Sequence, residues 1–253
     1  MRLLLPFATI CVLVSCTDSF ENPKQFKRQP IAVELMDDIE LHLEYDKKGL
    51  LLKETLFQRF GDPIEGVYEY DNEGRIKAVK TTVPGGINRE VAYRNGEIKS
   101  IEETQLDLDS SEQLVRRFTI SKYEKGRILD LSIEIPNRPR LAYSYEYLGN
   151  GNLIRLNEYS IDGHGKRSLK KYKLFTYKHR RNLLKGNFAF MHDIPTFYAQ
   201  NLVLDQKCYS PDDVLLYSET YEYEYEKGEP VEMTVTGVDS AGNDSLRWMK
   251  FTF

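Results

Sequence analysis

The feature that most constrains the fold is a recurring pair of alternating strand-like segments joined by a turn that contains glycine. The first copy spans residues 41–55 with its turn at 46–49, and the second spans 67–82 with its turn at 71–74. Alternation places successive side chains on opposite faces of a strand. An Asp starts each turn by bonding its own backbone, and Gly supplies the positive φ that closes it. The pattern therefore predicts β-hairpins.

Further copies extend this hairpin pattern through the chain. They lie at residues 91–104, 118–135, 143–159, 175–184 and 221–236. In the third copy, Asn95 and Gly96 form a clear short-hairpin signal. About seven hairpins, hence about fourteen strands, are predicted in a meander, because sequential strands usually pair.

The two faces of the predicted strands differ in chemistry. Residues 221–226 read Tyr-Glu-Tyr-Glu-Tyr-Glu, so one face is aromatic and the other acidic. Tyr tolerates a half-wet position, and the chain has 17 of them. We therefore predict an all-β, mostly antiparallel fold: a curled sheet or a partly closed barrel. Closure depends on strand tilt and register, which the sequence leaves open.

The hairpins resemble the YD repeats of Rhs-type proteins, which run roughly Tyr, any, Tyr, Asp, any, any, Gly, Arg, Leu or Ile. The second copy matches at Tyr68, Tyr70, Asp71, Gly74, Arg75 and Ile76, and the first matches in part at Tyr45, Asp46 and Gly49. In that family many such hairpins wind into a large shell around a toxin. This chain is too short for such a shell, so the resemblance implies strand geometry and not toxin function.

The N-terminus has the features of an export signal. Arg2 precedes an apolar run over residues 3–14 that is too short to anchor stably across a bilayer. Leu13, Val14, Ser15 and Cys16 match the lipobox of bacterial lipoprotein precursors. That resemblance implies cleavage before Cys16 and lipidation of its thiol. The alternative is an ordinary secreted protein whose leader ends near a cysteine.

The expected organisation follows from this leader. Residues 1–15 form the signal peptide, residues 16–30 a polar tether, and residues 31–253 a single β-domain. After processing and lipidation, Cys208 is the remaining free thiol, so no intramolecular disulfide is expected. The predicted location is the bacterial cell envelope, as an outer-membrane lipoprotein that faces either the periplasm or the cell surface. Export and a formal net charge of −4 argue against nucleic acid as the partner.

The whole chain resembles small envelope lipoproteins of Bacteroidetes that carry domains of unknown function. The resemblance rests on the lipobox, the short tether, the YD-like hairpins and one irregular segment before the last hairpins. Some of these relatives are described as having a porphyrin ligand. The resemblance thus implies haem or another porphyrin as one candidate ligand, and it transfers no ligand residue.

Residues 186–211 break the hairpin rhythm with an apolar, aromatic stretch too long for a bare turn. We expect it to cross the open face of the curled sheet, with part of residues 196–204 helical. It is either a plug that completes the core or a lid over a ligand. Met191 and His192 are adjacent residues of types that ligate haem iron.

A second asymmetry is a basic stretch over residues 163–192, which holds no acidic residue. It includes Lys171 and Lys173. These cations suit lipid phosphates, acidic glycans or porphyrin propionates. The alternative is a structural strand that pairs with acidic neighbours such as Glu222, Glu224 and Glu226.

Motifs for catalysis and metal binding are not found. Glutamates at i and i+2 on a strand lie roughly 6.6 Å apart, a separation used by inverting glycosidases, but three exposed like charges suggest a solvated face. The four histidines lack zinc-ligand spacing, and residues 162–168 read as a hairpin turn rather than a phosphate loop. Trp248 could stack on a sugar or pack in the core. No enzymatic activity is predicted.

Two functions remain in view. The first is a non-catalytic envelope lipoprotein that binds an apolar or amphipathic ligand. The second is a structural or protein-interaction module of the envelope, and a glycan-active enzyme is least favoured. The candidate ligand-binding residues are Phe190, Met191, His192, Phe197, Tyr198, Lys171 and Lys173, with Cys16 as the lipidation site.

Overall fold

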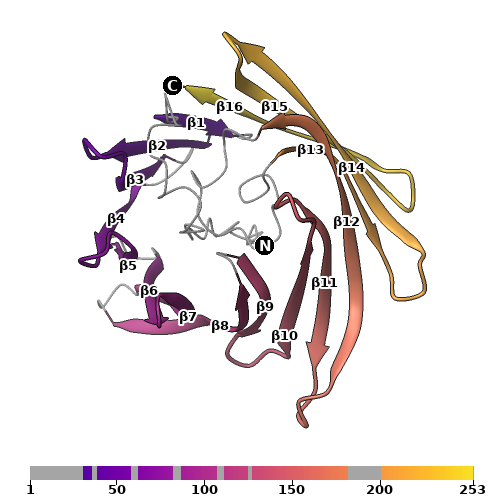
Figure 1. Ribbon diagram of the computed structural model, residues 1–253, viewed down its shortest axis with the longest axis horizontal. Coiled ribbons are helices and arrows are strands. Elements are labelled where there is room, and N and C mark those ends of the chain that lie inside the picture. Colours follow the sequence, from indigo (N-terminus) through magenta and orange to yellow (C-terminus); the bar gives the residue numbers. More distant parts are fainter. Residues whose placement is uncertain are drawn as a thin grey trace.

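A computed structural model shows a ring of antiparallel strands (Figure 1). It describes residues 31–35, 39–57, 62–81, 87–106, 111–124, 127–181 and 201–252. The strands are β1 (Ala32–Leu35), β2 (Ile39–Tyr45), β3 (Leu51–Phe57), β4 (Ile64–Tyr70), β5 (Ile76–Lys80), β6 (Ile87–Arg94), β7 (Glu97–Leu106), β8 (Glu112–Glu124), β9 (Arg127–Glu134), β10 (Arg140–Tyr147), β11 (Leu153–Ile161), β12 (Arg167–Arg181), β13 (Asn201–Tyr209), β14 (Leu215–Glu226), β15 (Glu229–Asp239) and β16 (Asp244–Thr252).

The sheet closes on itself. Each strand pairs antiparallel with the next along the chain, and β1 pairs with both β2 and β16, so the sixteen strands form a closed barrel. The predicted all-β antiparallel meander is confirmed. The prediction of about seven hairpins in a curled or partly closed sheet is wrong, because β1 and β13 adjoin no turn with the Asp and Gly signal, and the turn from Asp239 to Gly242 that leads into β16 lies outside the predicted copies.

The last third of the chain holds two further corrections. The predicted hairpin at 175–184 is absent as far as Arg181, since β12 continues through it as one strand of 15 residues. Residues 201–204, part of the segment expected to be helical, belong to β13 instead. Residues 186–200 of that segment lie outside the described part of the chain. Within that described part there is no helix, and so none of membrane-spanning length and apolarity.

The turns follow the predicted chemistry. Asp46 Oδ1 accepts the N–H groups of Lys48 and Leu50 at 2.7 and 2.8 Å, and Gly49 has φ 85°. The same Asp-to-backbone arrangement recurs at Asp71, Asp162 and Asp239. Asn95 and Gly96 both have positive φ, as a two-residue hairpin turn requires. Local sequence therefore fixes these connections.

In five hairpins a tyrosine lies at the turn end of the first strand, opposite an apolar residue of the second strand. Tyr45, Tyr70, Tyr93, Tyr123 and Tyr147 face Leu51, Ile76, Ile98, Ile128 and Leu153 across the strand pair, and a register shift precedes each tyrosine. A bulge adds twist and bends its strand. Its repetition at successive hairpins gives the sheet the regular curvature that closure requires.

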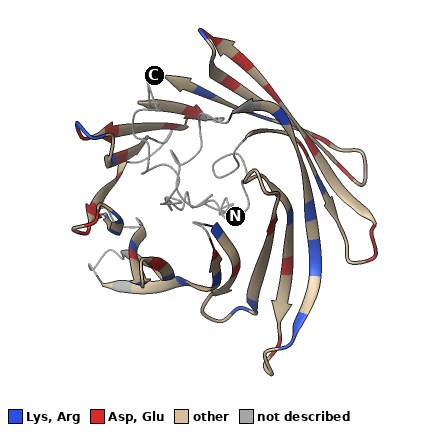
Figure 2. Cartoon of the chain, in the orientation of Figure 1, with Lys and Arg blue, Asp and Glu red and all other residues tan. Residues whose placement is uncertain are grey.

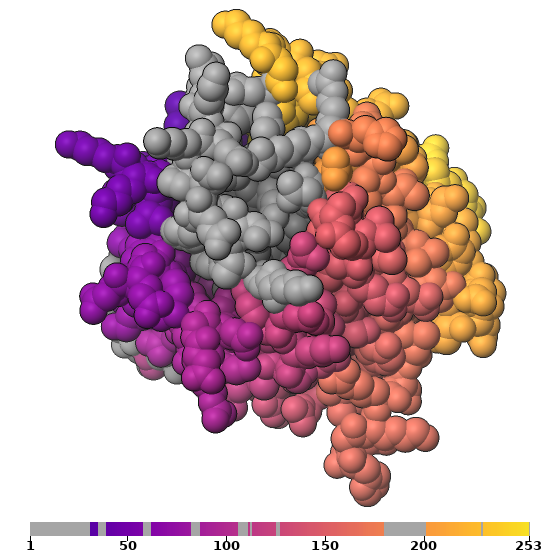
Figure 3. Space-filling view, in the orientation of Figure 1, coloured from indigo at the N-terminus to yellow at the C-terminus, as the bar shows by residue number. Residues whose placement is uncertain are grey.

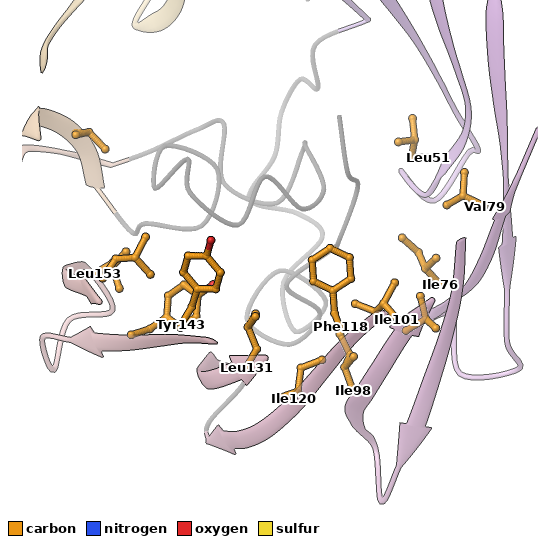
Figure 4. Close-up of a cluster of buried hydrophobic side chains, with 14 of the residues drawn as sticks. Leu51, Ile76, Val79, Ile98, Ile101, Phe118, Ile120, Leu131, Tyr143 and Leu153 are labelled. Carbon is orange, nitrogen blue, oxygen red and sulfur yellow. The ribbon is translucent and has the colours of Figure 1, made fainter. Parts of the chain in front are cut away.

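Apolar side chains line the inside of the ring. Figure 4 shows Leu51, Ile76, Phe118, Leu131 and Leu153 projecting from their strands towards the interior, and all are buried. The chain passes around the molecule in sequence order, as the colours of Figure 3 show. Lys, Arg, Asp and Glu are spread over the strands around the ring (Figure 2). The core is thus the inner wall of the barrel.

Candidate ligand-binding site on the inner wall

The inner wall is not uniformly apolar. Polar side chains interrupt it on two groups of strands. The first group comes from β3, β4, β6, β7 and β8, and the second from β11 to β16. Strand register places each of these side chains on the same face as buried core residues.

The first group is a buried charge network. Glu103 is fully buried, and its two carboxylate oxygens accept hydrogen bonds from Arg89 Nε at 2.9 Å and Arg116 Nε at 2.7 Å. The Tyr68 hydroxyl donates to Glu54 Oε2 at 2.8 Å. Burial raises the pKa of Glu54, against the opposing effects of Arg89 and of the Tyr68 hydrogen bond. These contacts pair the charges with one another, which is typical of a structural network.

Gly66 provides the space that Glu54 occupies. It lies opposite Glu54 in the β3–β4 pair, and a Cβ at position 66 would come within 3.0 Å of Glu54 Oε1 and 3.2 Å of Val79 Cγ1. A larger residue would therefore press on the carboxylate and on the core together.

The second group contains two carboxylates, Glu158 and Glu219, each with its own cationic partner. Glu158 forms an ion pair with Lys171 at 3.2 Å. Glu219 accepts hydrogen bonds from Gln206 Nε2 at 3.2 Å and from the Tyr221 hydroxyl at 2.9 Å, and Arg247 pairs with its other oxygen. Burial, with the nearby Glu219 carboxylate, raises the pKa of the Tyr221 hydroxyl.

Lys173 and Cys208 lie side by side between these two pairs. They are direct partners across β12 and β13, and both are buried. The Lys173 ammonium lies over the ring of Tyr217, 5.9 Å from its centroid. Burial raises the pKa of the Cys208 thiol, so it is neutral at physiological pH, although Lys173 and a hydrogen bond with Tyr217 act in the other direction.

Of the candidate residues named from the sequence, Lys171 and Lys173 come together on this wall. Phe190, Met191, His192, Phe197, Tyr198 and Cys16 lie outside the described residues. The alternative in which the basic strand pairs with acidic neighbours is confirmed for Lys171 with Glu158 and for Arg167 with Asp130. Glu222, Glu224 and Glu226 are not among these neighbours, because β13 separates β12 from β14. Those three glutamates are exposed on the outer face. Trp248 is half-buried on the outer face, with Lys250 5.1 Å from its ring, and is not a core residue.

The inward charges themselves were missed from the sequence. Arg89, Glu103 and Arg116 occupy the same strand face as Val91, Ile101 and Phe118. A charge in phase with the apolar positions of its own strand is the signal that could have found them. The metal-free prediction stays a prediction, and the described residues contain no group of three potential metal ligands.

Comparison with solved structures identifies the fold. A porin-like protein from Bacteroides vulgatus superposes with a TM-score of 0.57 at 12% identity, over 89% of this chain and 99% of that one. A porin-like protein from Bacteroides uniformis gives 0.54 at 12% identity, over 88% and 97%. A chain of the TcdB2–TccC3–Cdc42 complex matches with a TM-score of only 0.26. No family description and no curated protein matches the sequence.

The class defined by the fold is therefore a sixteen-stranded antiparallel barrel whose strand arrangement is similar to that of porin-like proteins. At 12% identity this similarity concerns the fold alone.

Proposed function

We propose that this protein is a non-enzymatic, lipid-anchored protein of the bacterial envelope whose barrel holds an apolar or amphipathic ligand. The observation that carries the proposal is the orientation of the strand faces. A mostly apolar face lines the inside of the barrel, and most charged strand residues are exposed on the outside.

This orientation is the reverse of a transmembrane barrel. A barrel in a bilayer needs an outward apolar band about 25 Å tall and has a polar interior. Here exposed outward positions include Glu40, Glu69, Lys77, Glu90 and Glu224, all within strands. The similarity to porin-like folds is therefore compatible with a barrel that stands outside the hydrocarbon layer, with the Cys16 lipid as its attachment.

The anchor can be tested directly. Cells grown with a radiolabelled fatty acid should incorporate label into the protein, and Cys16→Ser should abolish the label and release the protein from the membrane fraction without detergent. Cys208→Ser, which removes the other thiol of the mature chain, is the control and should keep the label. A Cys16→Ser protein that still needs detergent for extraction would contradict an anchored barrel and favour membrane insertion.

The size and composition of the inner wall support the proposal of a bound ligand. In barrels of 16 to 18 strands, side chains on the wall alone leave a channel, whereas about eight strands can be filled by their own side chains. An apolar wall of that circumference favours apolar contents. Lys171 and Lys173 add cations suited to an acidic head group, including porphyrin propionates.

Native mass spectrometry of the full chain carrying Cys16→Ser tests this function. The expected result is an added mass, either carried from the cell or acquired on incubation with haem or cis-parinaric acid. A Soret band shifted from that of free haem would identify a porphyrin site. No added mass with either probe would overturn the binding function and leave the structural or protein-interaction role.

A further inference from the structure

Lys173 differs from the ion-paired cations of the inner wall. It lies opposite Leu156 on β11 and Cys208 on β13, and two residues before the buried Phe175 on the same strand face. Only 8% of the residue is exposed. The side chain is therefore held on the inside of the barrel among core residues.

Four other inward cations have carboxylate partners. Arg89 and Arg116 share Glu103, Lys171 pairs with Glu158, and Arg247 pairs with Glu219. Lys173 forms no ion pair with any described carboxylate, and its recorded contact is the face of the Tyr217 ring.

The neighbouring groups do not replace the missing anion. A thiolate at Cys208 would be a counter-ion, but burial raises the pKa of that thiol and keeps it neutral. Glu158, the nearest acid by register, is already engaged by Lys171 at 3.2 Å and by the Tyr143 hydroxyl at 3.4 Å. An ammonium buried without an anion is strongly unfavourable, so the site is complementary to an anion from outside the described chain.

We propose that Lys173 binds the carboxylate of a long-chain fatty acid whose alkyl chain lies against the apolar inner wall. The inference rests on the proposed function and specifies its ligand class. One ammonium that lacks a partner matches a singly charged head group, and Leu156 and Phe175 continue the wall with apolar surface on either side. The Tyr217 ring supports the cation from one side and leaves its other N–H groups for the carboxylate oxygens.

The test compares an acid with its uncharged analogue. Binding of palmitic acid and of hexadecanol to the full chain carrying Cys16→Ser is measured by displacement of cis-parinaric acid. The parent should bind the acid at least about tenfold more tightly than the alcohol, since a charge-assisted contact in a desolvated site exceeds a neutral hydrogen bond. Lys173→Met, which keeps the length and apolar stem of the side chain, should remove that preference by weakening the binding of the acid more than that of the alcohol.

The matched control is Lys207→Met on the neighbouring strand, where the lysine is exposed on the outer face. It should keep the parental preference. Thermal melting without ligand separates binding from folding: Lys173→Met should melt at or above the parental temperature, because it removes a buried charge. A parent that binds acid and alcohol equally, or a Lys173→Met protein that keeps the preference, would overturn the carboxylate site alone. A parent that binds neither would overturn the proposed function with it.

Discussion

At the scale of single residues, the decisive feature is that charged side chains occupy positions inside the barrel. Glu103 is buried between two guanidinium groups, whereas the adjacent Glu102 forms an ion pair with Arg117 in which both side chains are more than 40% exposed. Alternation along β7 accounts for this contrast, because Glu103 is on the same strand face as the buried Ile101. Neighbouring glutamates thus have different energetic roles.

This contrast gives a paired stability prediction. Glu103→Gln removes the anion between two buried or partly buried arginines and should lower the free energy of unfolding by about 3–5 kcal/mol. Glu102→Gln should cost less than about 1 kcal/mol because its pair is exposed. Urea unfolding followed by tyrosine fluorescence measures both. Equal losses in the two variants would show that the Glu103 network is not buried in solution.

Glu54 gives a pH prediction. Burial raises its pKa above the ordinary value of 4.5, so the folded state binds more protons than the unfolded state in the window above pH 4.5. The contribution of Glu54 to stability is therefore present below that window and is lost as pH rises through the folded pKa. Glu54→Gln, which stays neutral, should gain stability relative to the parent as pH rises from about 4.5. A difference between the two proteins that is constant with pH would contradict this.

At the scale of elements, three tyrosine hydroxyls connect a strand to the hairpin before it. The Tyr70 hydroxyl donates to the Leu51 carbonyl at 2.6 Å, and the Tyr93 hydroxyl donates to the Ile76 carbonyl at 2.9 Å. Tyr177 makes the equivalent bond to Leu153. The acceptor is in each case the first strand residue after the turn of the preceding hairpin. The repeat therefore encodes the joint between hairpins as well as the turn.

The motif arginine adds to the same joint. Arg75 binds Asp71 of its own turn through Nη2 at 2.7 Å, and its guanidinium lies 4.5 Å from the ring centroid of Tyr93 on the next hairpin. A single residue thus contacts both the turn that precedes it and the tyrosine that follows.

Removal of these hydroxyls should loosen the joints. Tyr70→Phe and Tyr93→Phe should each lower the free energy of unfolding by about 1–2 kcal/mol, because a partly buried carbonyl loses its donor. Tyr209→Phe is the control. The Tyr209 ring stacks on the Tyr172 ring on the outer face, with the ring centroids 5.2 Å apart, so the loss of its hydroxyl should leave the free energy of unfolding nearly unchanged. Urea titration of the three variants measures the differences. A loss at Tyr209 as large as at Tyr70 would mean that the ring and not the hydroxyl joint determines stability.

At the scale of the whole molecule, closure depends on its shortest strand. β1 has four residues, and it joins β2 to β16 with Val33 opposite both Leu41 and Phe251. These three side chains are buried on the inner wall. The contact between the two ends of the chain is what makes the sheet a barrel.

A cross-link tests closure in solution. Glu34 and Lys250 are exposed partners across the β1–β16 seam. Glu34→Cys combined with Lys250→Cys, in the Cys16→Ser chain, should form a disulfide on mild oxidation and raise the free energy of unfolding by about 2–4 kcal/mol. Glu34→Cys with Thr236→Cys, whose second site is also on the outer face but is not a partner of Glu34, should remain reduced. An unoxidised seam pair would indicate an open sheet.

The sequence by itself determined the local structure. Alternation, Asp and Gly at the turns and the motif tyrosines specify hairpins and their order, because each depends on residues close along the chain. Strands without a nearby turn signal, such as β1 and β13, could not be predicted from local sequence. The turn before β16 carries the signal at Asp239 and Gly242, although no hairpin was predicted there. Lys171 and Lys173 were found because a basic stretch in an acidic chain is visible without a fold.

Only the tertiary structure decided closure and the direction of each strand face. β1 meets β16 after more than two hundred intervening residues, and the accumulated twist of the bulged hairpins sets that meeting. Closure also decided which strand face is the inner one, so Glu103, in phase with the buried Ile101, is buried and Glu102 is not. Burial without a described anion became apparent for Lys173 only when Leu156, Cys208 and Tyr217 were placed around it, since these residues come from three other strands.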